Sequence, residues 1–137
     1  MTRAVATNAY LFFALERQRY AIRLSAIDGV ESPRAIRAVP GAPPHVLGLA
    51  HWRGRLLTVV DLPGIVDDDS SGGTPSLLRL AAPHAGLALF LPAPTWIGHL
   101  QTGEASEGSI AWEGRSHRLL LPDELVAQAC RTEAGSA

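Results

Sequence analysis

The chain has little of several features that specialised folds and functions need. It contains no lysine, one cysteine and 18% charged residues, and its twelve arginines and thirteen acids leave a net charge of −1. A single cysteine, Cys130, excludes an internal disulfide and leaves no cysteine pair for structural zinc. The balanced charge argues against binding to nucleic acid or to an anionic membrane surface, because both need an excess of basic residues.

Long hydrophobic runs are also missing. The longest late run, residues 87–100, is broken by Pro92 and Pro94 and is too short to cross a bilayer. The N-terminus carries only Arg3 as a basic residue, and no cleavage site of small residues follows, which argues against a secretory signal. We therefore expect a soluble protein in the reducing cytoplasm, in which Cys130 packs and does not react.

Enough apolar material is present for one folded domain. Hydrophobic residues make up 47% of 137 residues, and a chain near this length buries about two-thirds of its unfolded surface. We expect a single domain over residues 10–130, with tails at 1–9 and 131–137. An acidic, glycine-rich loop near 66–75 separates two halves. Its three adjacent aspartates suggest calcium, but the EF-hand spacing is missing and a solvated, mobile loop is the favoured interpretation.

Short apolar runs alternate with turn residues along most of the chain, which is typical of an all-β domain. Thirteen glycines and ten prolines supply the breaks. Residues 10–15 are apolar on both faces, and residues 20–24 alternate with Tyr20, Ile22 and Leu24 pointing inward. Together these two segments predict a hairpin.

Further extended segments are expected wherever such runs recur. They are residues 29–31, 34–39, 48–51, 55–62, 77–81, 86–91, 96–101, 110–112 and 118–121. Tight turns are expected at 52–54 and 113–116. Pro44 is suited to open one helical turn, and residues 122–129 predict a helix because Pro122 is followed by two acids.

Motifs for catalysis or metal binding are not found in the sequence. The five histidines form no HxxH or HExxH pair, and there is no phosphate loop or nucleophile elbow. The candidate cluster is His51, Arg53 and Asp61, in which an ion pair and a base are conceivable. No nucleophile or second carboxylate accompanies them. The favoured interpretation is that Asp61 ends a strand and caps the next turn, so we expect no catalytic residue, metal or cofactor.

A binding role is better supported by Trp52. This tryptophan falls at the tip of an expected hairpin, between His51 and Arg53. Tryptophan and arginine are the residues found most often as anchors of protein interfaces. The residues alone therefore favour a small all-β binding module with a partner contact at Trp52.

From residue 20 to residue 62 the chain resembles the CheW family of chemotaxis adaptors. The matching pieces keep the family's spacing without gaps, and they are Tyr20-Ala21-Ile22, Ile27, Val30, Val39-Pro40, Pro43, Val46-Leu47-Gly48-Leu49-Ala50, His51-Trp52-Arg53-Gly54 and Thr58-Val59-Val60-Asp61-Leu62. Any one piece is weak, but the combination is specific. In outline the similarity extends from about residue 10 to residue 129.

The resemblance implies a fold of two loose, five-stranded SH3-like β-barrels packed together, with a short C-terminal helix. It implies a non-enzymatic scaffold that bridges the cytoplasmic hairpin tips of methyl-accepting chemoreceptors and the regulatory domain of a CheA-type histidine kinase. The receptor hairpin would lie in the groove between the barrels. By matching positions, the receptor contacts are expected at Ile27, Val30, Leu47, Gly48 and Arg53, with Gly54 forming the turn. The kinase contact is expected at exposed barrel ends.

The intact Arg53-Gly54 hairpin favours the adaptor, but the chain departs from the family pattern at three places, and the last of them, residues 91–94, favours a second hypothesis. His51 stands where asparagine is usual, Thr58 where proline is usual, and residues 91–94, Leu-Pro-Ala-Pro, where the family tends to have Val-Asp-x-Val. Two prolines cannot donate to a β-ladder, so this strand must end early or lie at an edge. The alternative is a diverged CheW-like protein that binds one partner. A distant third is a small-molecule-binding or enzymatic barrel.

Overall fold

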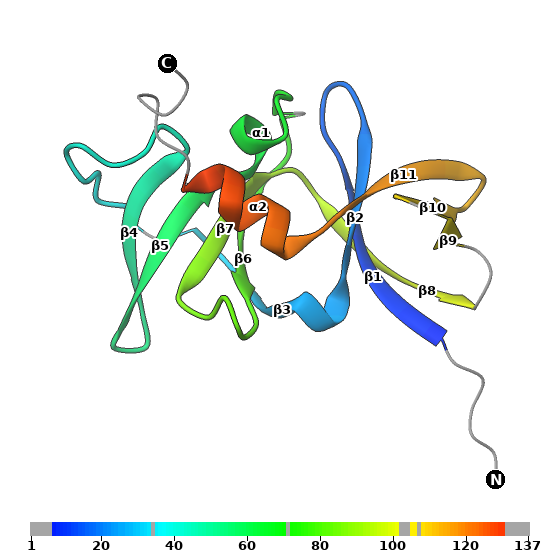
Figure 1. Ribbon diagram of the computed structural model, residues 1–137, viewed down its shortest axis with the longest axis horizontal. Coiled ribbons are helices and arrows are strands. Elements are labelled where there is room, and N and C mark those ends of the chain that lie inside the picture. Colours follow the sequence, from blue (N-terminus) through cyan, green and yellow to red (C-terminus); the bar gives the residue numbers. More distant parts are fainter. Residues whose placement is uncertain (1–6, 34, 71, 102–104, 107, 131–137) are drawn as a thin grey trace, which may run out of the picture.

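The computed structural model describes residues 7–33, 35–70, 72–101, 105–106 and 108–130. These residues form two β-sheets side by side, which we call lobe 1 and lobe 2, with one longer helix against them (Figure 1). The chain starts in lobe 1, builds all of lobe 2 and then returns to complete lobe 1. The expected all-β architecture of two lobes with a short C-terminal helix is confirmed.

Lobe 1 is a six-stranded sheet in the order β8-β1-β2-β11-β10-β9. Its strands are β1 (Thr7–Ala14), β2 (Arg19–Arg23), β8 (Thr95–Gln101), β9 (Ala105–Ser106), β10 (Ser109–Trp112) and β11 (Arg115–Leu120). The expected first hairpin is confirmed, because β1 pairs antiparallel with β2. The sixth strand, β9, is only two residues long and adds to the five that were expected.

Lobe 2 is a five-stranded sheet in the order β3-β6-β7-β5-β4. Its strands are β3 (Ile27–Glu31), β4 (Val46–Trp52), β5 (Arg55–Asp61), β6 (Pro75–Leu80) and β7 (Leu87–Pro92). A short 3₁₀ turn, η1 (Leu24–Ala26), leads from lobe 1 into β3. One helical turn, α1 (Leu62–Ile65), follows β5. The segment with two prolines behaves as expected, because β7 ends at Pro92.

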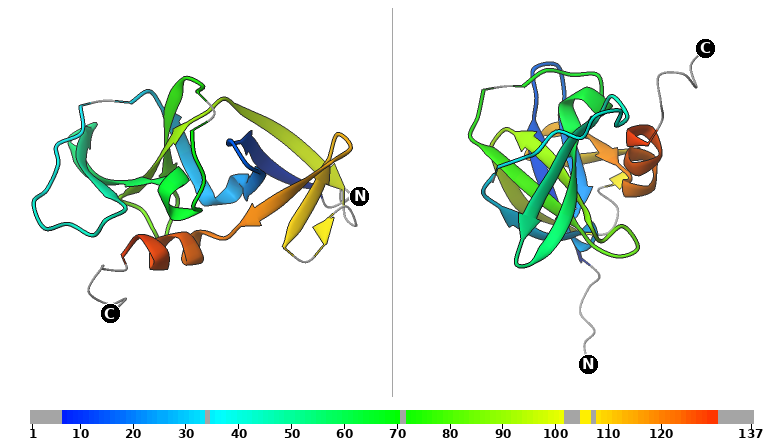
Figure 2. Two further views of the ribbon diagram at one scale, coloured as in Figure 1. Left: turned by 90° about the horizontal axis from the view of Figure 1, so that it is seen from above. Right: turned by 90° about the vertical axis from the view of Figure 1, so that its left-hand side faces the viewer.

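A shared hydrophobic core joins the lobes. Strand β1 is buried on both faces: Leu11 and Phe13 enter the main core, whereas Tyr10 and Phe12 enter a second cluster within lobe 1. The main core also contains residues of lobe 2 and of helix α2 (Pro122–Ala129). Figure 2 shows α2 lying along one side of the molecule, where the chain passes from β11 back toward lobe 2. The helix thereby fixes the end of the chain across both lobes.

Two hairpins close in the same way at the two ends of the molecule. Arg53 and Gly54 between β4 and β5 have φ angles of 49° and 76°, and Glu113 and Gly114 between β10 and β11 have 51° and 75°. Two consecutive positive φ angles define the tight turn that suits the twist of paired strands. The expected turn at 113–116 is therefore shorter than predicted, and β11 starts at Arg115.

Several local expectations are corrected. Of the segment expected to be extended at 34–39, the described residues 35–39 do not form a strand; Arg37 makes a single antiparallel bridge to Leu49 of β4. Pro44 opens a turn and not a helical turn. Cys130 is exposed, because it lies past the buried face of α2, whose core residues are Leu125 and Ala129.

The acidic loop after α1 also differs from its prediction. Asp68 is buried with 7% of its surface exposed, so the interpretation of a wholly solvated, mobile loop is wrong at this residue. Three donors bind its carboxylate, as described below. The expected tails at 1–9 and 131–137 lie almost wholly outside the described residues.

Candidate functional site

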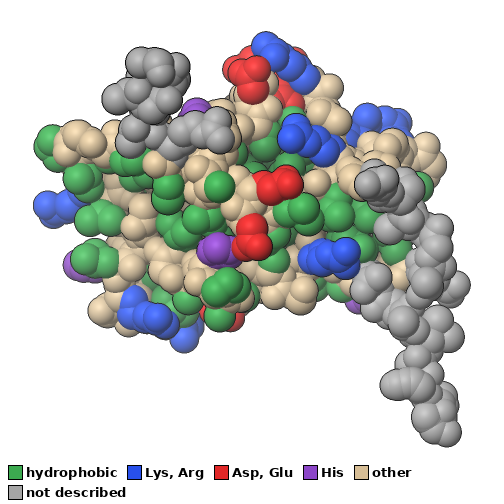
Figure 3. Space-filling model, viewed as in Figure 1, with side chains coloured by type: hydrophobic (Ala, Val, Ile, Leu, Met, Phe, Trp, Pro, Cys, Tyr) green, Lys and Arg blue, Asp and Glu red, His purple; other side chains and the backbone are tan. Residues whose placement is uncertain are grey.

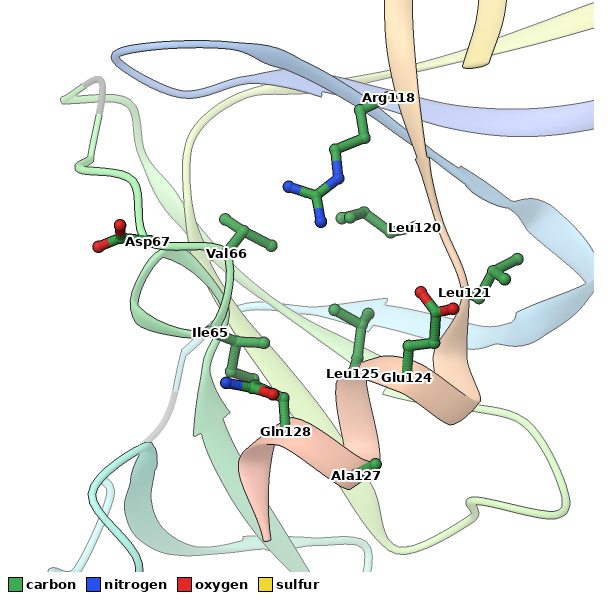
Figure 4. A pocket seen from close by; sticks show the side chains of 10 residues that line it. All are labelled: Ile65, Val66, Asp67, Arg118, Leu120, Leu121, Glu124, Leu125, Ala127 and Gln128. Atoms are coloured by element: carbon green, nitrogen blue, oxygen red, sulfur yellow. The ribbon is translucent and has the colours of Figure 1, made fainter. Parts of the chain in front are cut away.

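An open groove lies between the lobes beside α2 (Figure 4). Its volume is about 530 Å³, and it is lined by Ile65, Val66, Asp67, Arg118, Leu120, Leu121, Glu124, Leu125, Ala127 and Gln128. The first three residues come from α1 and the loop after it in lobe 2, the next two from β11 in lobe 1, and the rest from α2 and the residue before it. We call it the inter-lobe groove.

The groove combines an apolar floor with isolated charges. In Figure 4 the guanidinium of Arg118 points into the cavity, and the carboxylates of Asp67 and Glu124 lie at other points around it. None of the three side chains forms an ion pair within the part of the chain that the structure describes. On the face seen in Figure 3, hydrophobic side chains extend from one lobe across the junction to the other, with single charged side chains between them. Such a surface suits an amphipathic partner segment.

The loop from Val66 to Ser70, which we call the inter-lobe strap, binds the β1–β2 turn of lobe 1. The Asp68 carboxylate accepts hydrogen bonds from the Arg17 backbone N–H at 2.9 Å and from the Tyr20 hydroxyl at 2.8 Å. It also accepts the Asp69 backbone N–H at 2.7 Å. The Glu16 backbone N–H donates to the Asp69 carbonyl at 3.0 Å.

These bonds determine the titration of the two buried groups. Burial opposes ionisation of Asp68, but the bonds from Tyr20 and the two backbone N–H groups outweigh it and hold the pKa of this carboxyl below its ordinary value. Burial, followed by the hydrogen bond to Asp68 and its negative charge, raises the pKa of Tyr20. The pair therefore consists of a carboxylate and a neutral phenol at neutral pH.

The hairpin between β4 and β5 presents the residues of the family motif. Arg53 is exposed at the turn, with its guanidinium carbon 5.1 Å from the centre of the Trp52 ring. Arg79 of β6 lies closer, at 3.6 Å from the same ring. Trp52 is thus half-buried beneath two arginines, and Arg53 is itself exposed to solvent. Gly54 takes the second positive φ of the turn, as expected.

The other predicted receptor contacts lie elsewhere in lobe 2. Val30 of β3 is 46% exposed, whereas Ile27 of the same strand packs against the main core. Leu47 packs against a smaller core cluster. A Cβ built on Gly48 would clash with the Arg37 carbonyl oxygen. None of these four residues, nor Arg53, is among the residues that line the inter-lobe groove.

Each lobe also carries an apolar depression near its tight hairpin. On lobe 2 a depression of about 520 Å³ is lined by residues that include His51, Val39 and the 58%-exposed Leu56. On lobe 1 a depression of about 640 Å³ includes Trp112 and the half-exposed Trp96. Exposed apolar side chains gathered at a depression are typical of protein contact surfaces.

The candidate cluster of His51, Arg53 and Asp61 is not brought together. In the β4–β5 hairpin His51 pairs with Leu56 near the turn, whereas Asp61 stands at the far end of β5. Burial raises the pKa of Asp61, while the Gly64 backbone N–H and the charge of His45 act in the opposite direction. Asp61 ends its strand and holds the N-cap position of α1, as expected.

No three acidic, histidine or cysteine side chains come together as metal ligands in the described parts of the chain. None of the helices described there has the length and hydrophobicity to span a bilayer.

The sequence analysis missed Asp68, Arg118 and Glu124. Asp68 and Tyr20 are 48 residues apart in the sequence. Arg118 lies opposite Tyr20 only because β11 pairs in parallel with β2. One signal was readable: Trp52-Arg53-Gly54-Arg55 and Trp112-Glu113-Gly114-Arg115 repeat the same Trp-x-Gly-Arg pattern. That repeat marks the corresponding hairpins of the two lobes.

The fold is that of a small, two-lobed β domain with grooves on its surface, and the comparisons with known proteins specify the kind. Residues 9–74 match the family model of the CheW-like domain. The fold is similar to the crystal structure of the scaffolding protein TtCheW from Thermoanaerobacter tengcongensis, with a TM-score of 0.79 and 14% sequence identity over 91% of each chain. A search of the curated proteins finds no match. The resemblance to the CheW-like family is confirmed, and the fold is that of a CheW-like scaffold.

Proposed function

We propose that this protein is a non-enzymatic cytoplasmic scaffold that couples the hairpin tips of methyl-accepting chemoreceptors to the regulatory domain of a CheA-type histidine kinase. The observation that carries the proposal is the separation of its candidate surfaces. An inter-lobe groove and two end depressions lie on one rigidly cored, CheW-like fold. A partner in the groove and a partner at the lobe 1 end can therefore bind without sharing a surface.

The receptor tip is a helical hairpin, and its apolar positions need an apolar trough. The inter-lobe groove supplies such a floor with Arg118 and Glu124 at its margins. In lobe 2, Val30 and Arg53 are exposed and so available for direct contact. Ile27, Leu47 and Gly48 are covered to a greater degree, and they contribute by shaping the strands on which the exposed residues lie.

The kinase contact is assigned to the lobe ends. Leu56 is 58% exposed beside the lobe 2 depression, and Trp96 is 50% exposed beside that of lobe 1. The regulatory domain of such kinases is itself CheW-like, so it offers similar apolar lobe ends. The alternative, a scaffold that binds one partner, is favoured by the Pro92-Ala93-Pro94 segment, which ends β7 between the lobes.

The experiment is calorimetric titration of the protein with a receptor hairpin tip and, separately, with a kinase regulatory domain. We expect binding to both. The Arg53→Ala variant should bind the receptor tip more than about fivefold more weakly, the loss expected of an interface anchor, and bind the kinase domain normally.

Glu113→Ala is the matched control, because Glu113 holds the corresponding position of the other tight turn with nearly the same φ. It is a control for receptor binding alone, because Glu113 also lines the lobe 1 depression, and it should bind the receptor tip as the wild type does. Receptor binding alone by the wild type would support the one-partner alternative. Normal receptor binding by a folded Arg53→Ala variant would overturn the assignment of Arg53.

A further inference from the structure

The inter-lobe strap reaches across the boundary between the lobes next to the groove. It begins at Val66 and Asp67, which line the groove from the lobe 2 side. It then binds the β1–β2 turn of lobe 1 through Asp68 and Asp69. The width of the groove therefore depends on how firmly this loop is held against lobe 1.

The bonds that hold the strap come from several independent groups. Asp68 receives the Tyr20 hydroxyl and the Arg17 backbone N–H. The Arg17 guanidinium donates to the Asp67 carbonyl at 3.3 Å and lies 3.9 Å from the Asp69 carboxylate. The Ser70 hydroxyl donates to the Pro92 carbonyl at 3.2 Å, where β7 ends.

Among the residues that hold the strap, Asp68 differs from Arg17 and Asp69 because it is buried. Only 7% of the surface of Asp68 is exposed, and its carboxylate binds three donors. Arg17 and Asp69 are exposed, and their ion pair is long, so it contributes little. Removing the acceptor is costly because the Tyr20 hydroxyl, whose bond is buried, is left unsatisfied. The hold on the strap is therefore concentrated at Asp68.

We propose that Asp68 is a positioning residue that fixes the two lobes relative to each other and thereby sets the inter-lobe groove for its partner. The part concerning the partner rests on the proposed function. The part concerning the lobes does not, because it concerns the protein alone. Asp68 itself is not a contact residue, since it does not line the groove.

The first test measures the distance between the lobes. Spin labels are placed on the native Cys130, which is exposed at the end of α2 beside lobe 2, and on a cysteine at position 99, an exposed residue of β8 in lobe 1. Pulsed electron resonance should give one narrow distance distribution for this labelled parent. In the parent background, Asp68→Ala should broaden it markedly.

Two variants separate positioning from a general loss of structure. Asp68→Asn retains an oxygen acceptor for the two backbone N–H groups, and the Tyr20 hydroxyl can accept from the new amide, so the distribution should stay narrow. Ser70→Ala removes an exposed bond of the same loop and should also leave it narrow. If Asp68→Ala does not fold, Tyr20→Phe removes one bond across the lobes and should give a smaller broadening.

The second test measures binding to the receptor hairpin tip and to the kinase regulatory domain. Asp68→Ala should weaken receptor binding at least tenfold and kinase binding less than twofold, and Asp68→Asn should restore the receptor affinity. An unchanged distance distribution in folded Asp68→Ala and Tyr20→Phe would overturn the inference. Broadening in a protein whose wild type binds no receptor tip would leave the positioning role in place and overturn the proposed function.

Discussion

His117 is the only one of the five histidines that is buried. Its ring lies 4.9 Å from that of Phe12 and 5.8 Å from that of Trp112, measured between centroids. Burial lowers the pKa of this imidazole below 6.5, helped by the charge of Arg115 and opposed by hydrogen bonds with the backbone of Arg115 and Ile110. The folded protein therefore holds His117 neutral.

The consequence for stability follows from proton linkage. Below pH 6.5 the unfolded chain binds a proton at this histidine before the folded protein does, so the free energy of unfolding falls as the pH falls. We expect the loss of stability to set in as the pH falls below about 6.5 and to be complete below the lowered pKa of the folded state. Urea unfolding at a series of pH values measures it.

His117→Gln should remove this dependence while keeping a polar side chain. His99→Gln is the control, since His99 is exposed on β8, and it should keep the dependence of the wild type. If the free energy of unfolding of His117→Gln depends on pH as steeply as that of the wild type, another group is responsible for the dependence.

For single residues, the positions of exposed side chains could be predicted from the sequence better than those of buried polar side chains. Arg53 and Trp52 could be assigned to a hairpin tip because the turn is local. The Asp68–Tyr20 pair could not, because three adjacent aspartates beside serine and glycine favour a solvated loop. Only the docking of lobe 2 against lobe 1 supplies the hydroxyl and backbone donors that bury the carboxylate.

At the scale of the element, strand β4 depends on one glycine. Gly48 has a φ of 149°, and the register of β4 with β5 shifts between Val46 and Gly48. A side chain here would meet the carbonyl group of Arg37, which bridges β4 at Leu49. The close approach of two backbones therefore requires glycine.

Gly48→Ala should lower the free energy of unfolding by about 2 kcal/mol or more, because both backbone strain and a clash with main chain contribute. Gly54→Ala is the comparison: its φ is 76° but nothing lies within 4 Å of the added Cβ, so strain alone should cost about 1 kcal/mol. Urea unfolding of both variants gives the difference. An equal loss in the two would show that the segment around Arg37 moves aside freely.

Local patterns were sufficient for the hairpins and the C-terminal helix. Alternating apolar residues and Gly-containing turns predicted β4–β5, β6–β7 and β10–β11. They could not predict the parallel pairings of β11 with β2 and of β5 with β7, because those join segments far apart in the sequence. Residues 35–39 differ from the prediction for a related reason: Ile36 and Val39 suggest a strand, but this segment pairs with β4 only through one bridge at Arg37.

At the scale of the whole molecule, the second half of the chain keeps the fold although it shows little similarity to the family in sequence. The family model matches only residues 9–74, yet the fold agrees with that of TtCheW over 91% of the chain. Lobe 1 needs residues from both ends of the sequence, since β1 and β2 pair with β8 and β11. The segment from β8 to α2, which returns to lobe 1, forms these pairings although its sequence departs from the family pattern.

A protein that bridges a receptor and a kinase must bind both partners at the same time. The measurement is analytical ultracentrifugation of the protein with a receptor hairpin tip, with a kinase regulatory domain, and with both together. We predict a complex of the protein, the receptor tip and the kinase domain that sediments faster than the complex of the protein with either partner alone. Displacement of one partner by the other, with no three-component complex, would contradict it.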